Sequence, residues 1–225
     1  KYKNREMISL KKAVIFDLDG LLADSEIPTF EICRKMLLEY GKDITLAEYM
    51  HTYCGRVGVK NMEHIVSHYE LPITVQEGLC YISEAEKEYF AKGIPLKPGA
   101  KKLLRFLKEN GIKAVLATSS VKSRADTILE QNGISDYFFS AVYGSDVKNG
   151  KPDPEIFLTA AKKANAKPED CLVLEDSEAG ISAAHAADID VICIPDLKVP
   201  DEKYRKLAVA TLKSLDEVIG KLSKA

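Results

Sequence analysis

The sequence has few cysteines and no cysteine pairs, which argues against a disulfide framework or a zinc knuckle. The 225 residues include five cysteines and no C-x-x-C motif. An odd, dispersed set is typical of free thiols in a reducing compartment, so we expect a cytoplasmic protein. The five are Cys33, Cys54, Cys80, Cys171 and Cys193.

Long apolar runs and an excess of one charge are missing as well. The apolar run after the basic N-terminus, Ala13–Phe16, is far shorter than the ~7–15 residues of a signal peptide or the ~20 of a membrane helix. Thirty-two basic and 34 acidic residues leave a net charge of −2, which provides no electrostatic footprint for nucleic acid or an anionic membrane. We expect neither as a partner, and we expect a monomer or a weak homo-oligomer.

Several common motifs of nucleotide-binding and hydrolytic enzymes are absent. The chain contains no G-x-G-x-x-G, no G-K-[ST] and no G-x-S-x-G. Dinucleotide-binding, P-loop and serine-hydrolase functions therefore lack support.

The residues that are present indicate an α/β fold. Apolar residues make up 46% and charged residues 29%, an ordinary globular composition. Continuously apolar runs alternate with helical patterns, as expected for a doubly wound, Rossmann-like parallel sheet with helices on both faces. The predicted strands are Ala13–Phe16, Lys113–Ala117, Ala141–Tyr143, Cys171–Leu174 and Val191–Ile194, and the predicted helices between them are 101–109, 124–132 and 154–165.

The alternation is interrupted after the first strand. Residues 25–92 carry three helical patterns, 27–40, 60–69 and 75–92, and no convincing strand. A length of 225 residues fits one core with a smaller insertion better than two full domains. We therefore predict an α/β core of residues 1–24 and 93–225, and an inserted all-helical domain of residues 25–92.

Polar residues follow three of the predicted strands, at the edge where ligands bind in open α/β sheets. They are Asp17-Leu18-Asp19-Gly20, Thr118-Ser119-Ser120 and Glu175-Asp176-Ser177, with Lys151-Pro152 before the helix at Pro154. Each group alone has an ordinary explanation: a calcium loop, a helix cap, or a solvated lysine. Their occurrence at successive strand ends is hard to attribute to chance, and it predicts one shared site.

The chemistry of these groups suits phosphate. Clustered carboxylates repel one another unless a hard cation such as Mg²⁺ neutralises them. A lysine and backbone N–H groups can hold phosphate oxygens. One carboxylate is then a competent nucleophile that forms an aspartyl-phosphate, and a second acid two residues on can protonate the leaving oxygen and later activate water.

These residues resemble the four motifs of the haloacid-dehalogenase superfamily, in order and over nearly the whole chain. The resemblance implies a core with a helical cap, with Asp17 as nucleophile and Asp19 as general acid and base. It implies Mg²⁺ held by the Asp17 carboxylate, the Asp19 carbonyl and Asp176, with Glu175 direct or through water. Thr118 and the Ser119 amide would bind the phosphoryl group of a small-molecule phosphate ester, and Lys151 would balance its charge.

The resemblance leaves two enzyme classes open. Haloacid dehalogenases lack a second acid at the position of Asp19, so its presence favours phosphoryl transfer. β-Phosphoglucomutases have a histidine where this chain has Thr29, and an arginine where it has Gly58, with Arg56 displaced toward Gly55. These departures favour a phosphatase, with a mutase as the alternative. Ser25, Arg56 and Lys60 are the candidate cap residues that face the substrate.

A signalling receiver module is a rival from another class. It also uses Mg²⁺, an acceptor aspartate, a threonine and a lysine on a parallel sheet. Its acidic pair lies on the first strand, whereas the pair Glu175-Asp176 comes last here, and the helical insertion has no counterpart in it. The sequence therefore favours an enzyme.

Overall fold

A six-stranded, all-parallel sheet forms the centre of the protein. The structure is a computed structural model that describes residues 11–54 and 58–222. The strands run in the order β3-β2-β1-β4-β5-β6, with β1 in the interior. Their bounds are β1 Ala13–Phe16, β2 Lys113–Ala117, β3 Phe138–Val142, β4 Cys171–Glu175, β5 Asp190–Cys193 and β6 Ala210–Thr211. The predicted Rossmann-like α/β fold is confirmed.

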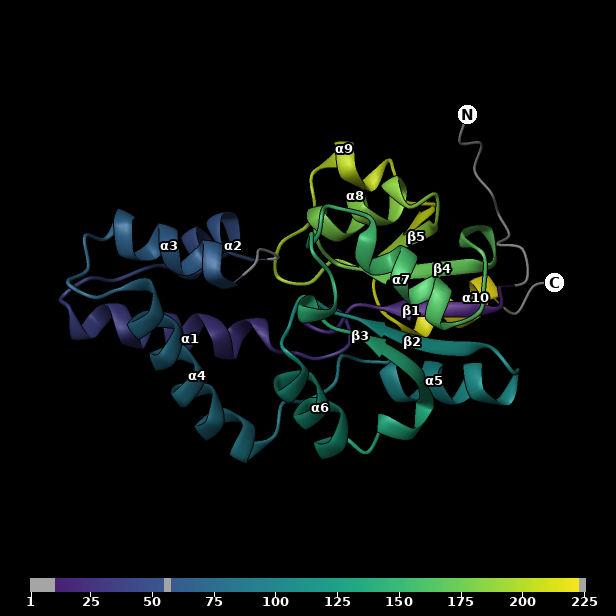
Figure 1. The fold of residues 1–225 in the computed structure, drawn as a ribbon, viewed down its shortest axis with the longest axis horizontal. Helices are drawn as coiled ribbons and strands as arrows, with labels where there is room; N and C mark the ends of the chain where they lie inside the picture. Colours follow the sequence, from purple (N-terminus) through teal and green to yellow (C-terminus); the bar gives the residue numbers. More distant parts are fainter. Residues whose placement is uncertain (1–10, 55–57, 223–225) are drawn as a thin grey trace.

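Helices cover both faces of the sheet because its strands are apolar on both sides (Figure 1). Along β1, Val14 and Phe16 pack with α5, α6 and α10, whereas Ala13 and Ile15 pack with α7 and α8. The helices are α5 Ala100–Glu109, α6 Lys122–Gln131, α7 Glu155–Lys163, α8 Glu178–Ala186, α9 Glu202–Arg205 and α10 Asp216–Leu222. Short 3₁₀ turns lie at Ser135–Tyr137, Gly144–Asp146 and Pro168–Asp170.

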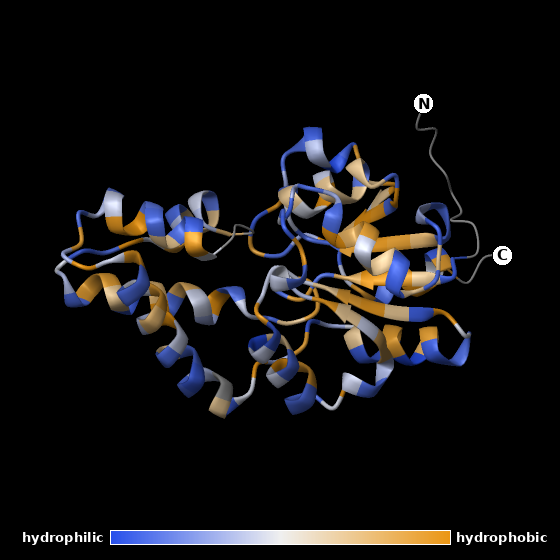
Figure 2. Ribbon diagram, in the orientation of Figure 1, coloured by the Kyte–Doolittle hydropathy of each residue, from blue (hydrophilic) through white to orange (hydrophobic). Residues whose placement is uncertain are grey.

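The helices between β1 and α5, hereafter the cap, form a second body beside the sheet (Figure 1). They are α1 Glu26–Glu39, α2 Leu46–Thr52, α3 Gly58–His68 and α4 Val75–Lys92. The cap has its own apolar cluster, which includes Met36, Tyr49 and Ile65, and apolar residues recur along its ribbon in Figure 2. The predicted all-helical insertion is confirmed as a feature of the fold.

Two chain segments connect the cap to the core, and backbone hydrogen bonds join these segments to each other. The Asp24 N–H donates to the Pro95 carbonyl at 2.9 Å, and the Lys97 N–H donates to the Leu22 carbonyl at 2.9 Å. The Lys97 ammonium also contacts the carboxylates of Asp24 and Asp196. The two segments on which the cap would pivot are thus held together immediately beside the residues that follow β1.

The element boundaries differ from the sequence prediction in a few places. Helix α2 and strand β6 were not predicted, because seven and two residues are too short for a periodic pattern to stand out. Strand β3 begins at Phe138 rather than Ala141, and α6 begins at Lys122 rather than Arg124.

Two further predictions can be compared with the described residues. All five cysteines lie among them and carry free thiols. No helix in the described ranges combines the length and apolar character needed to cross a bilayer.

Candidate active site

The loop after β1 carries Asp17 and Asp19 on a tight turn. Gly20 has a φ of 81°, and its N–H donates to the Ala23 carbonyl at 3.0 Å. A Cβ at Gly20 would lie 2.5 Å from Asp176 Oδ2, so the turn needs glycine both for its backbone conformation and for space. The turn therefore brings the loop after β1 against the loop after β4.

Lys151 lies between two carboxylates of the neighbouring strand ends. Its ammonium contacts Asp17 Oδ1 and donates to Glu175 Oε1 at 2.6 Å and to the Ala117 carbonyl at 3.2 Å. The side chain is only 6% exposed. Burial lowers the pKa of Lys151, but the charges of Asp17 and Glu175 outweigh it and raise that pKa overall, so the lysine is a buried cation.

Glu175 is completely buried, and hydrogen bonds occupy both of its carboxylate oxygens. Oε1 accepts from Lys151, and Oε2 accepts at 3.0 Å from the backbone N–H groups of Asp176 and Ser177 and from the Ser177 hydroxyl. Ser177 also caps α8 by accepting from the Gly180 N–H at 3.0 Å. In this arrangement Glu175 orients Lys151 and the start of α8.

Asp17 is a buried acid and Asp176 a half-buried one, and both have too little positive charge nearby. Burial raises the pKa of Asp17 to about 7, against the opposing charge of Lys151. Burial, and then the charges of Glu175 and Asp17, raise the pKa of Asp176 well above its usual range. Close by, Asp196 Oδ2 is buried and has no hydrogen-bond partner among the described residues. Buried acids of this kind favour a bound cation.

The donor set suits a hard cation held by few protein ligands. Within 11–54 and 58–222, no three carboxylate, imidazole or thiol side chains converge to hold a metal ion. The set implied by the family resemblance needs the carboxylates of Asp17 and Asp176 alone when Asp19 contributes its backbone carbonyl and Glu175 acts through water. Mg²⁺ commonly takes one or two carboxylates and completes its shell with water and substrate phosphate, so these residues fit it.

Asp19 is held by three donors from two separate segments, Ser25 at the start of the cap and Ser120 with Arg124 at the start of α6. Oδ1 accepts from the Ser25 hydroxyl at 2.6 Å and contacts the Arg124 guanidinium, and Oδ2 accepts from the Ser120 hydroxyl at 2.6 Å. Burial alone would raise the pKa of Asp19, but the charge of Arg124 and these hydrogen bonds hold that pKa below its usual range. The two aspartates of one motif therefore have opposite electrostatic environments.

The residues that follow β2 complete the site at the carboxyl edge of the sheet. Thr118 is buried, its N–H donates to the Val142 carbonyl at 3.0 Å, and its hydroxyl accepts from the Ser120 N–H at 3.0 Å. Ser119 is exposed, and its carbonyl lies so close to Gly144 that a Cβ there would come within 2.6 Å of it. Ser119 is thus the exposed residue of this loop, whereas Thr118 is buried.

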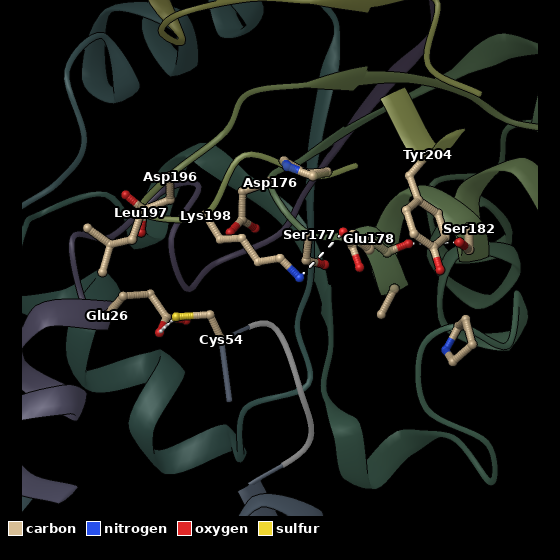
Figure 3. Close-up of a pocket in the computed structure, with 13 residues that line it drawn as sticks. Glu26, Cys54, Asp176, Ser177, Glu178, Ser182, Asp196, Leu197, Lys198 and Tyr204 are labelled. Atoms are coloured by element: carbon tan, nitrogen blue, oxygen red, sulfur yellow. Dashed lines mark hydrogen bonds and ion pairs between the residues drawn. The ribbon is translucent and has the colours of Figure 1, made fainter. Parts of the chain in front are cut away.

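A cavity of about 230 Å³ opens between the cap and these strand ends (Figure 3). Glu26 and Cys54 line it from the cap, and Asp176, Ser177 and Asp196 line it from the core. The Cys54 thiol donates to Glu26 Oε2 at 3.3 Å, and burial, together with the charge of Asp19, raises the pKa of Glu26 to about 7. The lining of the cavity combines carboxylate and hydroxyl groups with one lysine, Lys198, and with apolar residues such as Leu197 and Pro200.

The three predicted cap residues have different outcomes. Ser25 joins the site, but as a buried donor to Asp19 rather than as a group facing the cavity. Lys60 is exposed at the start of α3 and has no hydrogen bond or ion pair to any residue in the described ranges. Arg56 lies outside the described residues.

The prediction did not include Arg124, Glu26 and Asp196, which lie at the site in the structure. Arg124 and Ser120 are one helical turn apart, a spacing that places them on one face and could have signalled the contact. Glu26 carried no sequence signal, because it reaches the cavity only through the packing of the cap. Asp196 follows the predicted strand Val191–Ile194 by two residues, and the prediction did not use that signal.

The comparisons with known proteins agree with this geometry. A family model described as haloacid dehalogenase-like hydrolase matches residues 11–188. The chain belongs to this family. A phosphorylated carbohydrates phosphatase of Thermotoga maritima is 36% identical over 184 residues, covering 80% of this chain and 83% of that protein. The haloacid dehalogenase-like chain is thereby identified as an enzyme of the phosphatase class.

Two further relatives extend the comparison. A bifunctional riboflavin kinase/FMN phosphatase of Arabidopsis thaliana is 37% identical over 220 residues, which cover 95% of this chain but only 55% of that longer protein. The crystal structure of a β-phosphoglucomutase from Clostridium difficile has a TM-score of 0.79 and 26% identity, covering 96% of this chain and 98% of that one. This haloacid dehalogenase-like protein therefore shares its fold, cap included, with both phosphatases and mutases.

Proposed function

We propose that this protein is a Mg²⁺-dependent phosphatase that hydrolyses a small phosphomonoester through an aspartyl-phosphate on Asp17. The observation that carries the proposal is the environment of the two aspartates of the first motif. Asp17 lies against the buried cation Lys151, and Asp19 is oriented by hydrogen bonds two residues away. One carboxylate is placed to attack and the other to transfer protons.

The reaction has two steps. In the first, an Asp17 carboxylate oxygen forms a bond to phosphorus while the bond to the leaving oxygen breaks, and Asp19 delivers a proton to that oxygen. In the second, Asp19 takes a proton from water, which attacks the aspartyl-phosphate and releases inorganic phosphate. Lys151, the Thr118 hydroxyl and the Ser119 amide hold the phosphoryl oxygens, and Lys151 balances their charge.

Mg²⁺ is the cation that this donor set suits. Asp17, the Asp19 carbonyl and Asp176 would hold it, with Glu175 contributing directly or through water. When bound, the ion neutralises charge on the phosphoryl oxygens. The raised pKa values of Asp17 and Asp176 support this assignment, because burial and mutual repulsion make both acids costly to ionise without a cation.

The cavity supports a small polar ester as substrate. The cavity has a volume of about 230 Å³, and its lining includes hydroxyl, carboxylate and apolar groups together with Lys198. Such a lining suits a leaving group that carries several hydroxyl donors on an apolar ring, such as a sugar or nucleotide phosphate. The named activities of the relatives, on phosphorylated carbohydrates and on FMN, fall in the same range of chemistry.

A phosphosugar mutase is the second candidate, because a β-phosphoglucomutase structure superimposes over 96% of the chain. Thr29 stands where the mutases have a histidine, and its hydroxyl donates to the Ser25 carbonyl at 2.9 Å. A threonine bonded within its own helix offers no imidazole to the substrate. This favours hydrolysis over transfer between two sugar hydroxyls.

The deciding experiment measures phosphate release from a panel of sugar and nucleotide phosphates, with Mg²⁺ and with EDTA. We expect EDTA-sensitive turnover by the wild type and none by Asp17→Asn, with an unchanged circular dichroism spectrum. Absence of turnover across the panel, or an active Asp17→Asn variant, would contradict the proposal. Conversion of β-glucose 1-phosphate with a bisphosphate primer to glucose 6-phosphate, followed by NMR, would establish the mutase instead.

A further inference from the structure

The side chain of Arg124 bridges the core and the cap at the site. Arg124 lies in α6 of the core, one turn after Ser120, and its side chain is 13% exposed. Its Nη1 contacts Asp19 Oδ1 and donates to the Ser120 hydroxyl at 2.8 Å, and its Nε donates to Glu86 Oε1 at 3.2 Å. Glu86 belongs to the last cap helix, α4, whose end lies beside α6 (Figure 1).

This bridge differs from an ordinary surface ion pair. The Asp19 and Glu86 side chains are 24% and 19% exposed, so all three charged groups are largely removed from water. A guanidinium is planar and presents donors in a fixed fork, so its contact with Asp19 and its contact with Glu86 depend on each other's geometry. The two hydroxyl donors to Asp19, from Ser25 and Ser120, carry no charge and make no contact of this kind with α4.

We propose that Arg124 is a positioning residue that sets the orientation of the Asp19 carboxylate according to the position of the cap. The proposal rests on the proposed function, in which Asp19 protonates the leaving oxygen. Because Glu86 and Asp19 share one guanidinium, a displacement of α4 relative to α6 changes how Arg124 holds Asp19. The cap thereby acts on proton transfer as well as on access to the cavity.

The test separates positioning of Asp19 from general structural support by varying the leaving group. Protonation of the leaving oxygen matters for an alkyl phosphate and little for a nitrophenyl phosphate, whose leaving group departs as a stable anion. The quantity to compare is kcat/KM, which covers the steps through release of the leaving group. We expect Arg124→Gln to lower kcat/KM for the alkyl ester at least ~10-fold more than for the nitrophenyl ester.

Two further variants examine the charge and the link to the cap. Arg124→Lys keeps the positive charge but lacks the planar set of guanidinium donors. We therefore expect it to recover part of the alkyl-ester activity that Arg124→Gln loses. Glu86→Gln weakens the contact of Arg124 with the cap and leaves its contact with Asp19. We therefore expect a smaller loss of kcat/KM that again affects the alkyl ester more than the nitrophenyl ester. The double variant should be no worse than Arg124→Gln alone, because both changes act through one guanidinium. Arg34→Gln, which removes an exposed cap ion pair with Asp43, serves as the control without effect.

The outcomes distinguish this proposal from the proposed function. If the wild type hydrolyses no alkyl phosphate of the sugar and nucleotide panel and no nitrophenyl phosphate, the proposed function fails and this inference with it. If the wild type hydrolyses both and Arg124→Gln lowers both equally or neither, only the role of Arg124 is refuted. If Arg124→Gln does not fold, Arg124→Lys and Glu86→Gln decide the same question, and unselective losses in both refute it. Independent, additive losses from Glu86→Gln and Arg124→Gln would refute the link to the cap.

Discussion

Gly180 leaves no room for a side chain beside the carboxylate of Glu175. A Cβ on Gly180 would lie 1.8 Å from Glu175 Oε1 and 1.9 Å from its Cδ. The Glu175 side chain has little room to move away, because it is completely buried and accepts a hydrogen bond from Lys151. A glycine on the first turn of α8 therefore determines where the buried lysine of the site can lie.

Replacing this glycine should disturb the site through Glu175. We expect Gly180→Ala to displace the Glu175 carboxylate, lower the free energy of unfolding by about 1–3 kcal/mol through overpacking, and reduce kcat. Gly220→Ala is the matched control: its Cβ would meet open space in α10, so alanine should leave activity unchanged and stabilise the helix by up to ~1 kcal/mol. Chemical denaturation and turnover measure both. A Gly180→Ala variant equal to the wild type would contradict the close contact.

Removing the buried lysine should cost both stability and activity. Lys151→Met leaves Asp17 and Glu175 without their shared cation, and breaking a buried ion pair on one side costs about 3–5 kcal/mol. We also expect kcat/KM to fall by at least ~10²-fold, because the phosphoryl oxygens lose a charge. Lys163→Met, which removes a 40%-exposed partner of Asp146, should cost less than about 1 kcal/mol and leave turnover intact. Equal effects of the two variants would be incompatible with the site described.

Glu26 should make the protein less stable as the pH rises. Its folded pKa is raised to about 7, so the folded state binds its proton more tightly than the unfolded state, where the pKa is about 4.3. This contribution is fully present below about pH 4 and is lost as the pH rises to 7, at a cost on the order of 1–3 kcal/mol. Glu26→Gln removes the titration, so unfolding free energies of the two proteins should diverge between pH 5 and pH 8. Parallel pH profiles would show that Glu26 ionises freely.

We expect Asp176 to lower the stability of the metal-free protein and to raise its affinity for Mg²⁺. Its half-buried carboxylate is repelled by the charges of Glu175 and Asp17, so Asp176→Asn relieves that repulsion and should raise the thermal stability measured in EDTA. The same variant loses a proposed Mg²⁺ ligand, so calorimetric titration should show weaker Mg²⁺ binding. Asp43→Asn, at an exposed cap carboxylate, should change neither measurement by much. Unchanged Mg²⁺ affinity in Asp176→Asn would remove Asp176 from the ligand set.

Much of the fold could be predicted because its elements have strong local signals. The predicted strands Ala13–Phe16 and Lys113–Ala117 and the predicted helix Val75–Lys92 coincide with β1, β2 and α4. Continuous apolar runs and glycine or proline boundaries are properties of neighbouring residues, so sequence alone reveals them. Strand β6 was missed because two residues that pair only with β5 carry no such pattern.

The gathering of Asp17, Asp19, Lys151, Glu175 and Asp176 at one edge was also predictable. Parallel strands place their carboxyl ends together, so residues that directly follow β1 and β4 must meet once the strands are recognised. The individual roles of these residues stay predictions. The contacts among them, such as the position of Lys151 between two acids, depend on side-chain packing that motif order does not specify.

The sequence by itself determined the fold class, the inserted helices and the set of acidic, hydroxyl and lysine groups that share one edge of the sheet. Only the tertiary structure decided which groups face the cavity and which hold them in place. Arg124, Glu86 and Asp19 are far apart in the chain and carry no common motif, yet one guanidinium contacts both acids. Local patterns encode strands and helices, whereas a contact between the cap and the core exists only after both have folded and packed together.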